Sequence, residues 1–330
     1  MSPAGAVIVG HGIAVPEGRL TNADLEARVD TSDAWIVERT GIRERRIAGP
    51  DESTATLATT AAAAAIKSAG LTPSEIDLLI VATQSPEQPM PHTGAFVGEQ
   101  LGLQCGSFDL AAACSGFVYE LVVGASMLAT GSRNVLLVGA ETVSRLMDPT
   151  DRSTTILFGD GAGAAVIAPG ESGEGLIAWD LGCDGSAAGL LEIPAGGSRL
   201  PTSIETVHAR QHYMTMAGQE VFRRALRVVV DSCSTTLDKA GLTASDVDWF
   251  VPHQANLRII EGGAHRLGVP REKTIVNIER YGNTSSASIP IALFEAVDDG
   301  RVQPGDLVLV CGFGAGMTWA SALIRWSAPR

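Results

Sequence analysis

Aromatic and charged residues are both scarce in this chain of 330 residues, at 5% and 18% of the sequence. Cysteine occurs only five times, at widely spaced positions and without a CxxC pair, which argues against a disulfide framework and a zinc cluster. No run approaches the roughly 18 uncharged apolar residues of a membrane helix, and the N-terminus lacks the basic lead and long apolar core of a signal peptide. We therefore expect a cytoplasmic protein with reduced thiols.

Positive charge is also in short supply, since 24 Lys and Arg face 37 Asp and Glu, a net charge of −13. This sign argues against a general nucleic-acid binder, and an acidic partner would need a local basic patch. GDGAG (159–163) and GFGAG (312–316) lack the glycine spacing of a dinucleotide fingerprint. His208 and His212 lie four residues apart but lack the glutamate of a zincin and a third ligand, so we expect no metal.

What the chain does contain is an alternation of short apolar runs and helical patterns. The runs at 6–10, 77–83, 134–139 and 248–251 read as strands, and those at 30–42, 54–69 and 216–240 read as helices. Such alternation predicts an α/β fold with buried, largely parallel strands. With 45% hydrophobic residues, a chain of this length can bury a large core.

An internal repeat organises the chain. AGLTPSEID at 69–77 returns as AGLTASDVD at 240–248, an offset of 171 residues. RNVLLVGA at 133–140 echoes GDLVLVCG at 305–312 near the same offset. Two unrelated segments that repeat together predict two similar halves, residues 1–175 and 176–330.

Cys114 lies in DLAAACSGFVYEL (109–121), which reads as the end of a strand, a tight turn and a helix. At a helix N-terminus, free backbone N–H groups and the helix dipole favour a thiolate, so Cys114 is a candidate nucleophile. A free cysteine is more often a small buried hydrophobe. On these residues alone both interpretations stay open.

The second half offers partners for such a nucleophile. His253 follows a predicted strand at its carboxyl end, where open α/β sheets place ligand sites, although a lone histidine is often structural. Adding 171 to 114 gives position 285, inside NTSSAS, and Asn283 in that turn could donate a hydrogen bond to a developing negative charge. The glycine-rich turn near residues 312–316 could supply oxyanion donors.

Trp35 and Arg39 are spaced to share one face of the helix predicted at 30–42. They could form a surface cation–π pair or a platform for a planar ligand such as a nucleobase.

Together these motifs resemble the β-ketoacyl-ACP synthase III enzymes, which start type II fatty acid synthesis and belong to the thiolase superfamily. The resemblance spans nearly the whole chain, through DTSDAWIVERTGIRERRIA, DPTDRSTTILFGDGAGAAV, PHQANLRII, NTSSASIP and GFGAGMTWASALIRW. It implies an α/β thiolase fold of duplicated halves in five αβαβα layers, usually paired as a homodimer.

The resemblance also implies an acyltransferase with a catalytic triad of Cys114, His253 and Asn283. The thiolate would take the acyl group from acyl-CoA, with N–H groups of Cys114, Ala315 and Gly316 as oxyanion hole. His253 and Asn283 would stabilise the enolate formed when malonyl-ACP loses carbon dioxide. The product would be a β-ketoacyl-ACP, and the reaction would need no cofactor.

Further residues are implied by the same resemblance. CoA would contact Thr31, Trp35, Arg39, Arg152, Gly218, Phe222, Ala255 and Asn256. Acyl carrier protein (ACP) would contact Arg223, Gln254, Arg258 and Arg266. Met90 falls where many members have a phenylalanine that closes the acyl pocket from the neighbouring subunit, so the pocket is expected to accept primers other than acetyl.

Three alternatives remain at this point. The same fold could serve as a starter-loading ketosynthase or acyltransferase of a polyketide or other specialised pathway. A cysteine hydrolase would use Cys114 and His253 alone. A non-catalytic scaffold would need an unreactive Cys114.

Overall fold

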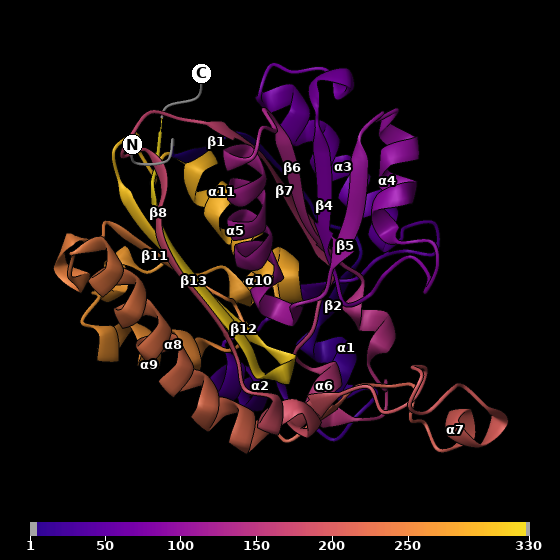
Figure 1. The fold of residues 1–330 in the computed structure, drawn as a ribbon. Coiled ribbons are helices and arrows are strands. Elements are labelled where there is room, and N and C mark those ends of the chain that lie inside the picture. Colours follow the sequence, from indigo (N-terminus) through magenta and orange to yellow (C-terminus); the bar gives the residue numbers. More distant parts are fainter. Residues whose placement is uncertain (1–4, 328–330) are drawn as a thin grey trace.

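The computed structural model describes residues 5–327, so the outer ends of the two predicted halves, 1–4 and 328–330, lie outside the described residues. Figure 1 shows two β-sheets separated and covered by helices. Within the described residues, no helix is long and apolar enough to cross a membrane.

The first sheet has five strands in the order β1-β7-β6-β4-β5. β4 and β6 are buried along their whole length because both faces of the sheet are covered by helices. α3 and α4 pack on one face, and α5 and α11 on the other. The bounds are β1 Ala6–Ala14, β4 Leu78–Ala82, β5 Gly106–Leu110, β6 Val135–Glu141, β7 Gly161–Pro169, α3 Thr54–Ser68, α4 Thr93–Leu101, α5 Gly116–Ala129 and α11 Ser288–Asp298.

The second sheet has four strands in the order β11-β12-β13-β8. α5 and α11 lie against its inner face, while α8 and its neighbour α9 form the outer layer. The bounds are β8 Gly175–Cys183, β11 Trp249–Pro252, β12 Leu307–Gly314, β13 Thr318–Arg325, α8 Gly218–Ala240 and α9 Leu257–Leu267. The result is five layers, α3/α4, sheet, α5/α11, sheet and α8/α9, as the resemblance implied.

The central helices are apolar on all sides because they face a sheet in both directions. Phe117 of α5 and Phe294 of α11 are fully buried and meet edge to face, with ring centroids 6.1 Å apart. Pro290 is tolerated because it lies in the first turn of α11. The deepest core of the molecule therefore lies between the two sheets.

The two sheets repeat one pattern of strand directions. β1, β7 and β6 are antiparallel neighbours and β6, β4 and β5 are parallel, while β8, β13 and β12 are antiparallel and β12 is parallel to β11. Phe250 of β11 forms an isolated parallel bridge to Thr274. In the second sheet this bridge occupies the place that β5 has in the first. β11 starts at Trp249, 171 residues after Leu78 starts β4. The division of the chain at residue 175 stays a prediction.

The expectation of largely parallel strands is wrong. Four of the seven ladders in the two main sheets are antiparallel. At β13 the antiparallel direction has a local cause: a turn of only three residues, Ala315–Met317, leads β13 back along β12. Apolar content alone does not report strand direction.

The remaining elements lie near the ends of the two sheets or project from them. Thr21 and Asp24 form a capping box at the start of α1. Residues around α7 extend away from the body of the molecule (Figure 1). The bounds are β2 Arg19–Thr21, α1 Asn22–Glu26, α2 Asp33–Thr40, β3 Glu44–Arg46, α6 Arg152–Thr155, β9 Leu191–Glu192, α7 Ile204–His208, β10 Thr215–Met216 and α10 Ile278–Tyr281.

Candidate active site

Cys114 occupies the turn between β5 and α5, as the sequence predicts. It lies in the short 3-10 turn Ala113–Ser115, directly before the first residue of α5. The side chain is buried, with 7% of the residue exposed. The first N–H groups of a helix have no intrahelical acceptor, so this position offers backbone donors close to the sulfur.

The end of β12 passes directly over the backbone of Cys114. A Cβ atom on Gly314 would lie 2.6 Å from the Cys114 backbone nitrogen and 2.7 Å from the Ala113 Cβ. Only glycine fits so close a contact. The glycine-rich turn thus reaches the cysteine from the second half, and Ala315 lines a cavity together with Cys114.

Burial dominates the chemistry of the thiol. It raises the pKa of Cys114 to about 12, with a further raising effect from Glu141, while a hydrogen bond with Ser285 acts in the opposite direction. Burial therefore opposes the effect that the helix N-terminus has on the thiol. The thiol must lose its proton as it attacks a substrate.

His253 lies immediately after β11, at the carboxyl end of the strand. Its backbone N–H donates to the Cys311 carbonyl at 2.7 Å, and its ring meets Phe313 edge to face at 5.5 Å. Burial lowers the pKa of His253 to about 3, so the imidazole is neutral at physiological pH. Nδ1 is buried and has no hydrogen-bond partner among the described residues.

Asn283 is held by hydrogen bonds of its backbone and of its side-chain oxygen, Oδ1. Its N–H donates to the Leu157 carbonyl at 2.9 Å, and its carbonyl accepts from the Gly159 N–H at 3.0 Å. The side-chain Oδ1 accepts from the Ser285 N–H at 2.9 Å. Because Oδ1 is occupied in this way, the amide NH₂ group is turned away from the Ser285 backbone and is available as a donor.

Ser285 links the two halves. The Cys114 thiol donates to the Ser285 hydroxyl at 3.5 Å, and this hydroxyl donates to Glu141 Oε1 at 2.9 Å. Glu141 ends β6, is fully buried, and also accepts from the backbone N–H and the hydroxyl of Ser85. Burial raises the pKa of this carboxyl although its hydrogen bonds favour the carboxylate. The position mirrored from Cys114 by the repeat therefore touches the cysteine itself.

Two cavities meet at Cys114. The first is narrow, about 90 Å³, and brings the cysteine together with His253 and Asn283. Four of the predicted CoA contacts, Gly218, Phe222, Ala255 and Asn256, line this cavity. The second has about 280 Å³ and is mostly apolar, with walls from residues that include Val143, Leu146, Phe158, Ile193 and Met214.

The other predicted CoA residues gather around Trp35. The guanidinium carbons of Arg39 and Arg152 each lie 4.8 Å from the centre of its ring system. The buried Thr31 hydroxyl has no hydrogen-bond partner among the described residues. Asn256 ties this cluster to the narrow cavity, because its side-chain amide donates to the Arg39 carbonyl at 2.9 Å.

The predicted carrier-protein residues do not all reach the surface. The Arg223 side chain is 78% exposed, and Arg258 lies over the Phe222 ring at 5.5 Å. Gln254 is 1% exposed, and its side chain donates to the Pro252 and Ile275 carbonyls and accepts from the Asn277 N–H. The assignment of Gln254 to a carrier-protein surface is therefore corrected: it holds the His253 loop from inside.

Met90 stands apart from both cavities of its own chain. It is 82% exposed, on the loop between β4 and α4. The loop is anchored at its end, where Asp109 of β5 accepts hydrogen bonds from the Thr93 and Gly94 N–H groups at the start of α4. Met90 is thus held outward.

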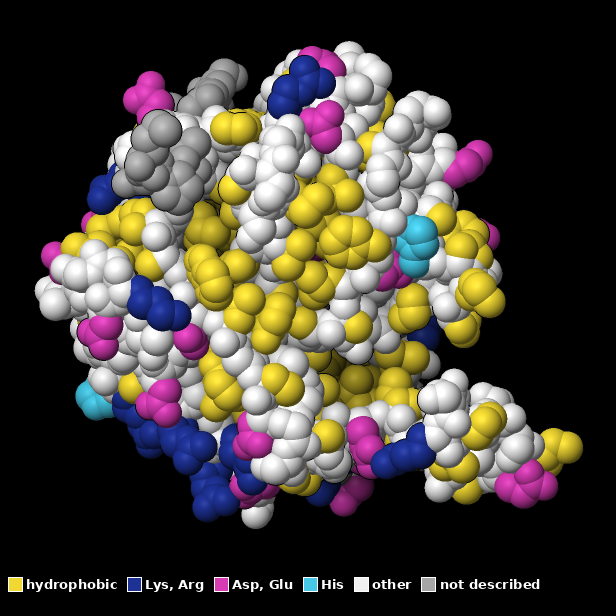
Figure 2. Space-filling model, viewed as in Figure 1, with side chains coloured by type: hydrophobic (Ala, Val, Ile, Leu, Met, Phe, Trp, Pro, Cys, Tyr) yellow, Lys and Arg dark blue, Asp and Glu magenta, His cyan; other side chains and the backbone are white. Residues whose placement is uncertain are grey.

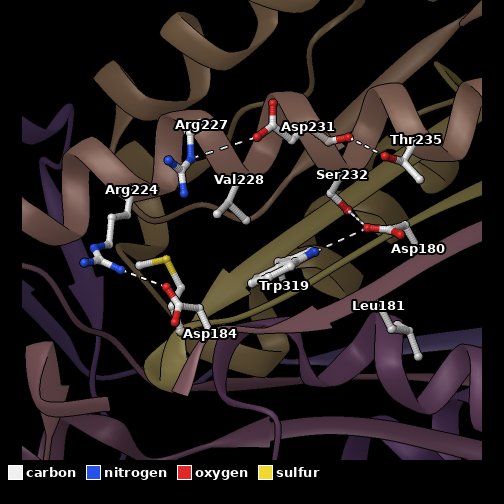
Figure 3. A pocket seen from close by; sticks show the side chains of 11 residues that line it. Asp180, Leu181, Asp184, Arg224, Arg227, Val228, Asp231, Ser232, Thr235 and Trp319 are labelled. Carbon is white, nitrogen blue, oxygen red and sulfur yellow. Dashed lines mark hydrogen bonds and ion pairs between the residues drawn. The ribbon is translucent and has the colours of Figure 1, made fainter. Parts of the chain in front are cut away.

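A third cavity, about 500 Å³, is separate from Cys114 and lies between α8 and the strands β8 and β13 (Figure 3). Its polar groups pair with one another: Ser232 and the Trp319 indole donate to Asp180, and Arg224 donates to Asp184. No predicted site residue lines it. In the described part of the chain, no group of three or more His, Cys, Asp or Glu residues could hold a metal ion.

Three residues at the site were not expected from the sequence: Glu141, Ser285 and Phe158. Glu141 carried a usable signal, since a carboxylate at the end of a wholly apolar strand must find partners when buried. Phe158, which lines both cavities, carried no signal. Its role depends on a bridge to Asn283 that only the folded chain forms.

Comparison with known proteins supports these assignments of fold and class. Family models described as 3-oxoacyl-[acyl-carrier-protein] synthase III match residues 108–185 and, for the C-terminal model, 237–326. β-Ketoacyl-[acyl-carrier-protein] synthase III of Symbiobacterium thermophilum is 51% identical over 97% of both chains.

Two solved structures are also similar. The crystal structure of 3-oxoacyl-[acyl-carrier-protein] synthase III from Aquifex aeolicus superposes with a TM-score of 0.91, at 44% identity, over 98% of this chain and 100% of that one. The priming β-ketosynthase of the R1128 polyketide biosynthetic pathway is 37% identical, with a TM-score of 0.92, over 99% of this chain and 98% of that one.

The duplicated five-layer fold defines the chain as a thiolase-fold condensing enzyme, an acyltransferase. Within that class, identity near 50% over almost the full length is decisive. The chain belongs to the β-ketoacyl-ACP synthase III family.

Proposed function

We propose that the chain condenses an acyl-CoA primer with malonyl-ACP to give β-ketoacyl-ACP, CoA and carbon dioxide, the first condensation of fatty acid synthesis. The observation that carries this proposal is the meeting of Cys114, His253 and Asn283 around one narrow cavity. A cysteine supplies the nucleophile, and two uncharged side chains supply donors for an enolate oxygen.

In the first half-reaction the Cys114 sulfur attacks the thioester carbonyl of acyl-CoA. The carbon–sulfur bond to CoA breaks, and CoA leaves as its thiol, taking up the proton lost by Cys114. The pKa of Cys114, about 12, requires that this proton leave during the attack, and it ends on the departing CoA sulfur. N–H groups of Cys114, Ala315 and Gly316 serve as oxyanion donors.

In the second half-reaction malonyl-ACP loses carbon dioxide, and the electron pair of the broken bond forms an enolate. The enolate carbon attacks the acyl-cysteine carbonyl, and the Cys114 sulfur leaves as a thiolate and takes up a proton from the solvent. His253 and Asn283 donate hydrogen bonds to the enolate oxygen. Because Nδ1 of His253 is buried without an acceptor, we assign the proton to Nε2.

The second cavity supports a primer longer than acetyl. Its walls are largely apolar, and a volume of about 280 Å³ exceeds what two carbons fill. Each buried methylene adds about 0.8 kcal/mol to binding. The primer is therefore a straight or branched acyl chain, and no cofactor is needed because the thioester and the lost carbon dioxide supply the driving force.

The surroundings of the tunnel support two further partners. The cluster of Trp35 with Arg39 and Arg152 offers a ring and positive charge for the adenine and phosphates of CoA. Arg223, Arg258 and Arg266 offer positive charge on α8 and α9 to the acidic carrier protein. The five unpaired cysteines suit the reducing cytoplasm, where we place the enzyme.

A homodimer is the proposed assembly. β5 forms an edge of the first sheet, pairing with β4 on one side only, and Phe108 on it is 37% exposed. Figure 2 shows hydrophobic side chains gathered on the face where α5, β5 and β8 lie in Figure 1. Pairing of two β5 edges would cover this area and carry Met90 towards the partner.

The half-reactions can be tested separately. Acyl-CoAs from acetyl to decanoyl, straight and branched, are mixed with the enzyme, and the mass of the Cys114 peptide is measured. Malonyl-ACP is then added, and carbon dioxide and β-ketoacyl-ACP are followed. We expect acylation by primers longer than acetyl and condensation from the acylated enzyme.

Matched variants assign the roles. Cys114→Ala abolishes both half-reactions, whereas Cys183→Ala, at an exposed cysteine, leaves both unchanged. His253→Ala and Asn283→Ala still form acyl-cysteine but lose condensation about 10²- to 10³-fold. Rapid hydrolysis of acyl-CoA without malonyl-ACP, unaffected by Asn283→Ala, would instead identify a hydrolase.

A further inference from the structure

Arg45 is the largest side chain that is fully buried, and no part of the proposed reaction uses it. Its guanidinium has no carboxylate within 4 Å among the described residues. A buried charge without a counter-ion is costly, so such a residue persists where its hydrogen bonds hold something in place.

The hydrogen bonds of Arg45 go to neutral oxygens on two sides. Nε and Nη2 both donate to the Ile156 carbonyl, at 3.0 and 2.5 Å. Nη1 donates to Asn22 Oδ1 at 2.6 Å. The guanidinium thus binds the Ile156 carbonyl with two N–H groups, while its third hydrogen bond fixes it to Asn22 at the start of α1.

The pinned segment, residues 156–159, is the one that holds Asn283. Its Leu157 carbonyl and Gly159 N–H bond the backbone of Asn283 on both sides, at 2.9 and 3.0 Å. Its Phe158 forms the wall between the two cavities at Cys114. Asn283 has no comparable backbone support from the Cys114 side.

Arg45 also limits the turn that leads into Asn283. Gly282 has a φ of +64°, and a Cβ there would lie 2.7 Å from the Leu157 carbonyl oxygen and 3.0 Å from Arg45 Cγ. The stem of Arg45 is therefore packed against the residue preceding Asn283. Arg45 thus contacts both segments next to Asn283: residues 156–159 and the turn at Gly282.

We propose that Arg45 is a positioning residue for Asn283, acting through residues 156–159. The inference rests on the proposed role of Asn283 in the second half-reaction. Loss of Arg45 would release the Ile156 carbonyl, and the Asn283 amide would shift from the enolate oxygen, while Cys114, held by β12 and α5, would stay in place.

The test separates the two half-reactions in Arg45→Met, which keeps an unbranched apolar stem. We expect Cys114 acylation within about threefold of wild type and condensation lowered about 10²-fold, since a displacement near 1 Å costs about that much. Adding Arg45→Met to Asn283→Ala lowers condensation by no more than about threefold further, because both changes remove one interaction. Arg43→Met, at an exposed arginine two residues away, changes neither step.

Arg45→Lys is measured alongside, with thermal unfolding of every variant, because Arg45→Met removes a buried network. A lysine can donate to the Ile156 carbonyl but cannot form the fork, so condensation recovers to within about tenfold of wild type. Equal losses in both half-reactions, in whichever variant folds, would overturn the inference. Additive losses with Asn283→Ala would do the same. If Asn283→Ala alone fails to separate the half-reactions, the proposed role of Asn283 fails first.

Discussion

Burial shifts the protonation of the two reactive residues, and both stay uncharged. The Cys114 thiol has its pKa raised to about 12 and the His253 imidazole has its pKa lowered to about 3, each by loss of water. A neutral pair can meet a CoA thioester without the cost of a buried charge. In its proposed role as nucleophile, Cys114 would therefore lose its proton as it attacks the thioester.

Alkylation of Cys114 should report this state. Iodoacetamide labelling of the free enzyme, measured on the Cys114 peptide, should rise about tenfold for each pH unit from 7 to 10 without a plateau, because only the thiolate reacts. Labelling of the exposed Cys183 in the same digest serves as the reference for reagent and access. A plateau near pH 7 would mean that the helix N-terminus outweighs burial.

His253 should also make the fold sensitive to acid. Its folded pKa of about 3 lies below the usual 6.5, so between these values the unfolded chain binds a proton that the folded chain does not. Stability should therefore fall as the pH drops below 6.5, by up to about 1.4 kcal/mol per unit from this residue.

The measurement is urea unfolding at pH 7 and pH 4.5 for wild type, His253→Gln and His208→Gln, the last at an exposed histidine. His253→Gln should lose roughly 2–3 kcal/mol less than wild type between the two pH values. His208→Gln should follow wild type. Equal losses in all three proteins would show that His253 titrates normally when folded.

At the scale of elements, the site is a meeting of turns at strand ends. β5 delivers Cys114, β11 delivers His253, and β12 delivers the turn with Ala315 and Gly316. β6 ends in Glu141, whose carboxyl gathers Ser85 and Ser285. Strands that point the same way bring their carboxyl ends to one place, which is why four separate segments share a site.

Gly314→Ala should displace β12 relative to Cys114 without removing a reactive group. The added methyl would lie 2.6 Å from the Cys114 nitrogen, so strand or turn must move. Overpacking of this kind costs about 1–3 kcal/mol, and we expect acylation to fall about 10²-fold. Gly189→Ala is the control, since its Cβ would meet nothing within 4 Å. Full activity in Gly314→Ala would show that β12 does not set the position of Cys114.

At the scale of the whole molecule, one chain carries a complete set of reactive residues but leaves an edge strand and an apolar face open. Met90 is held outward and touches neither cavity of its own chain. A second copy would cover the face and bring its own Met90 to this site. Assembly and primer choice are thus coupled in the proposed dimer.

Phe108→Asp should expose that coupling. A carboxylate on β5 opposes pairing of two edges, so light scattering should show a monomer for this variant and the proposed dimer for the wild type. If the proposed dimer brings the partner's loop to the site, activity with long primers should fall in parallel. Thr60→Asp adds the same charge on the exposed side of α3 and should leave the dimer intact. A dimeric Phe108→Asp would place the interface elsewhere.

The sequence by itself determined the repeat and the positions of the helices and strands that carry Cys114 and His253. These depend on local pattern and on spacing, which a chain carries in one dimension. Tertiary structure decided the rest. Its ladders are antiparallel where parallel ones were expected, and the side chain of Gln254 is buried. Contacts between distant segments bring Glu141, Phe158 and Arg45 to the region of the site. The tertiary structure also raised the pKa of the Cys114 thiol, because desolvation depends on what surrounds the sulfur on every side.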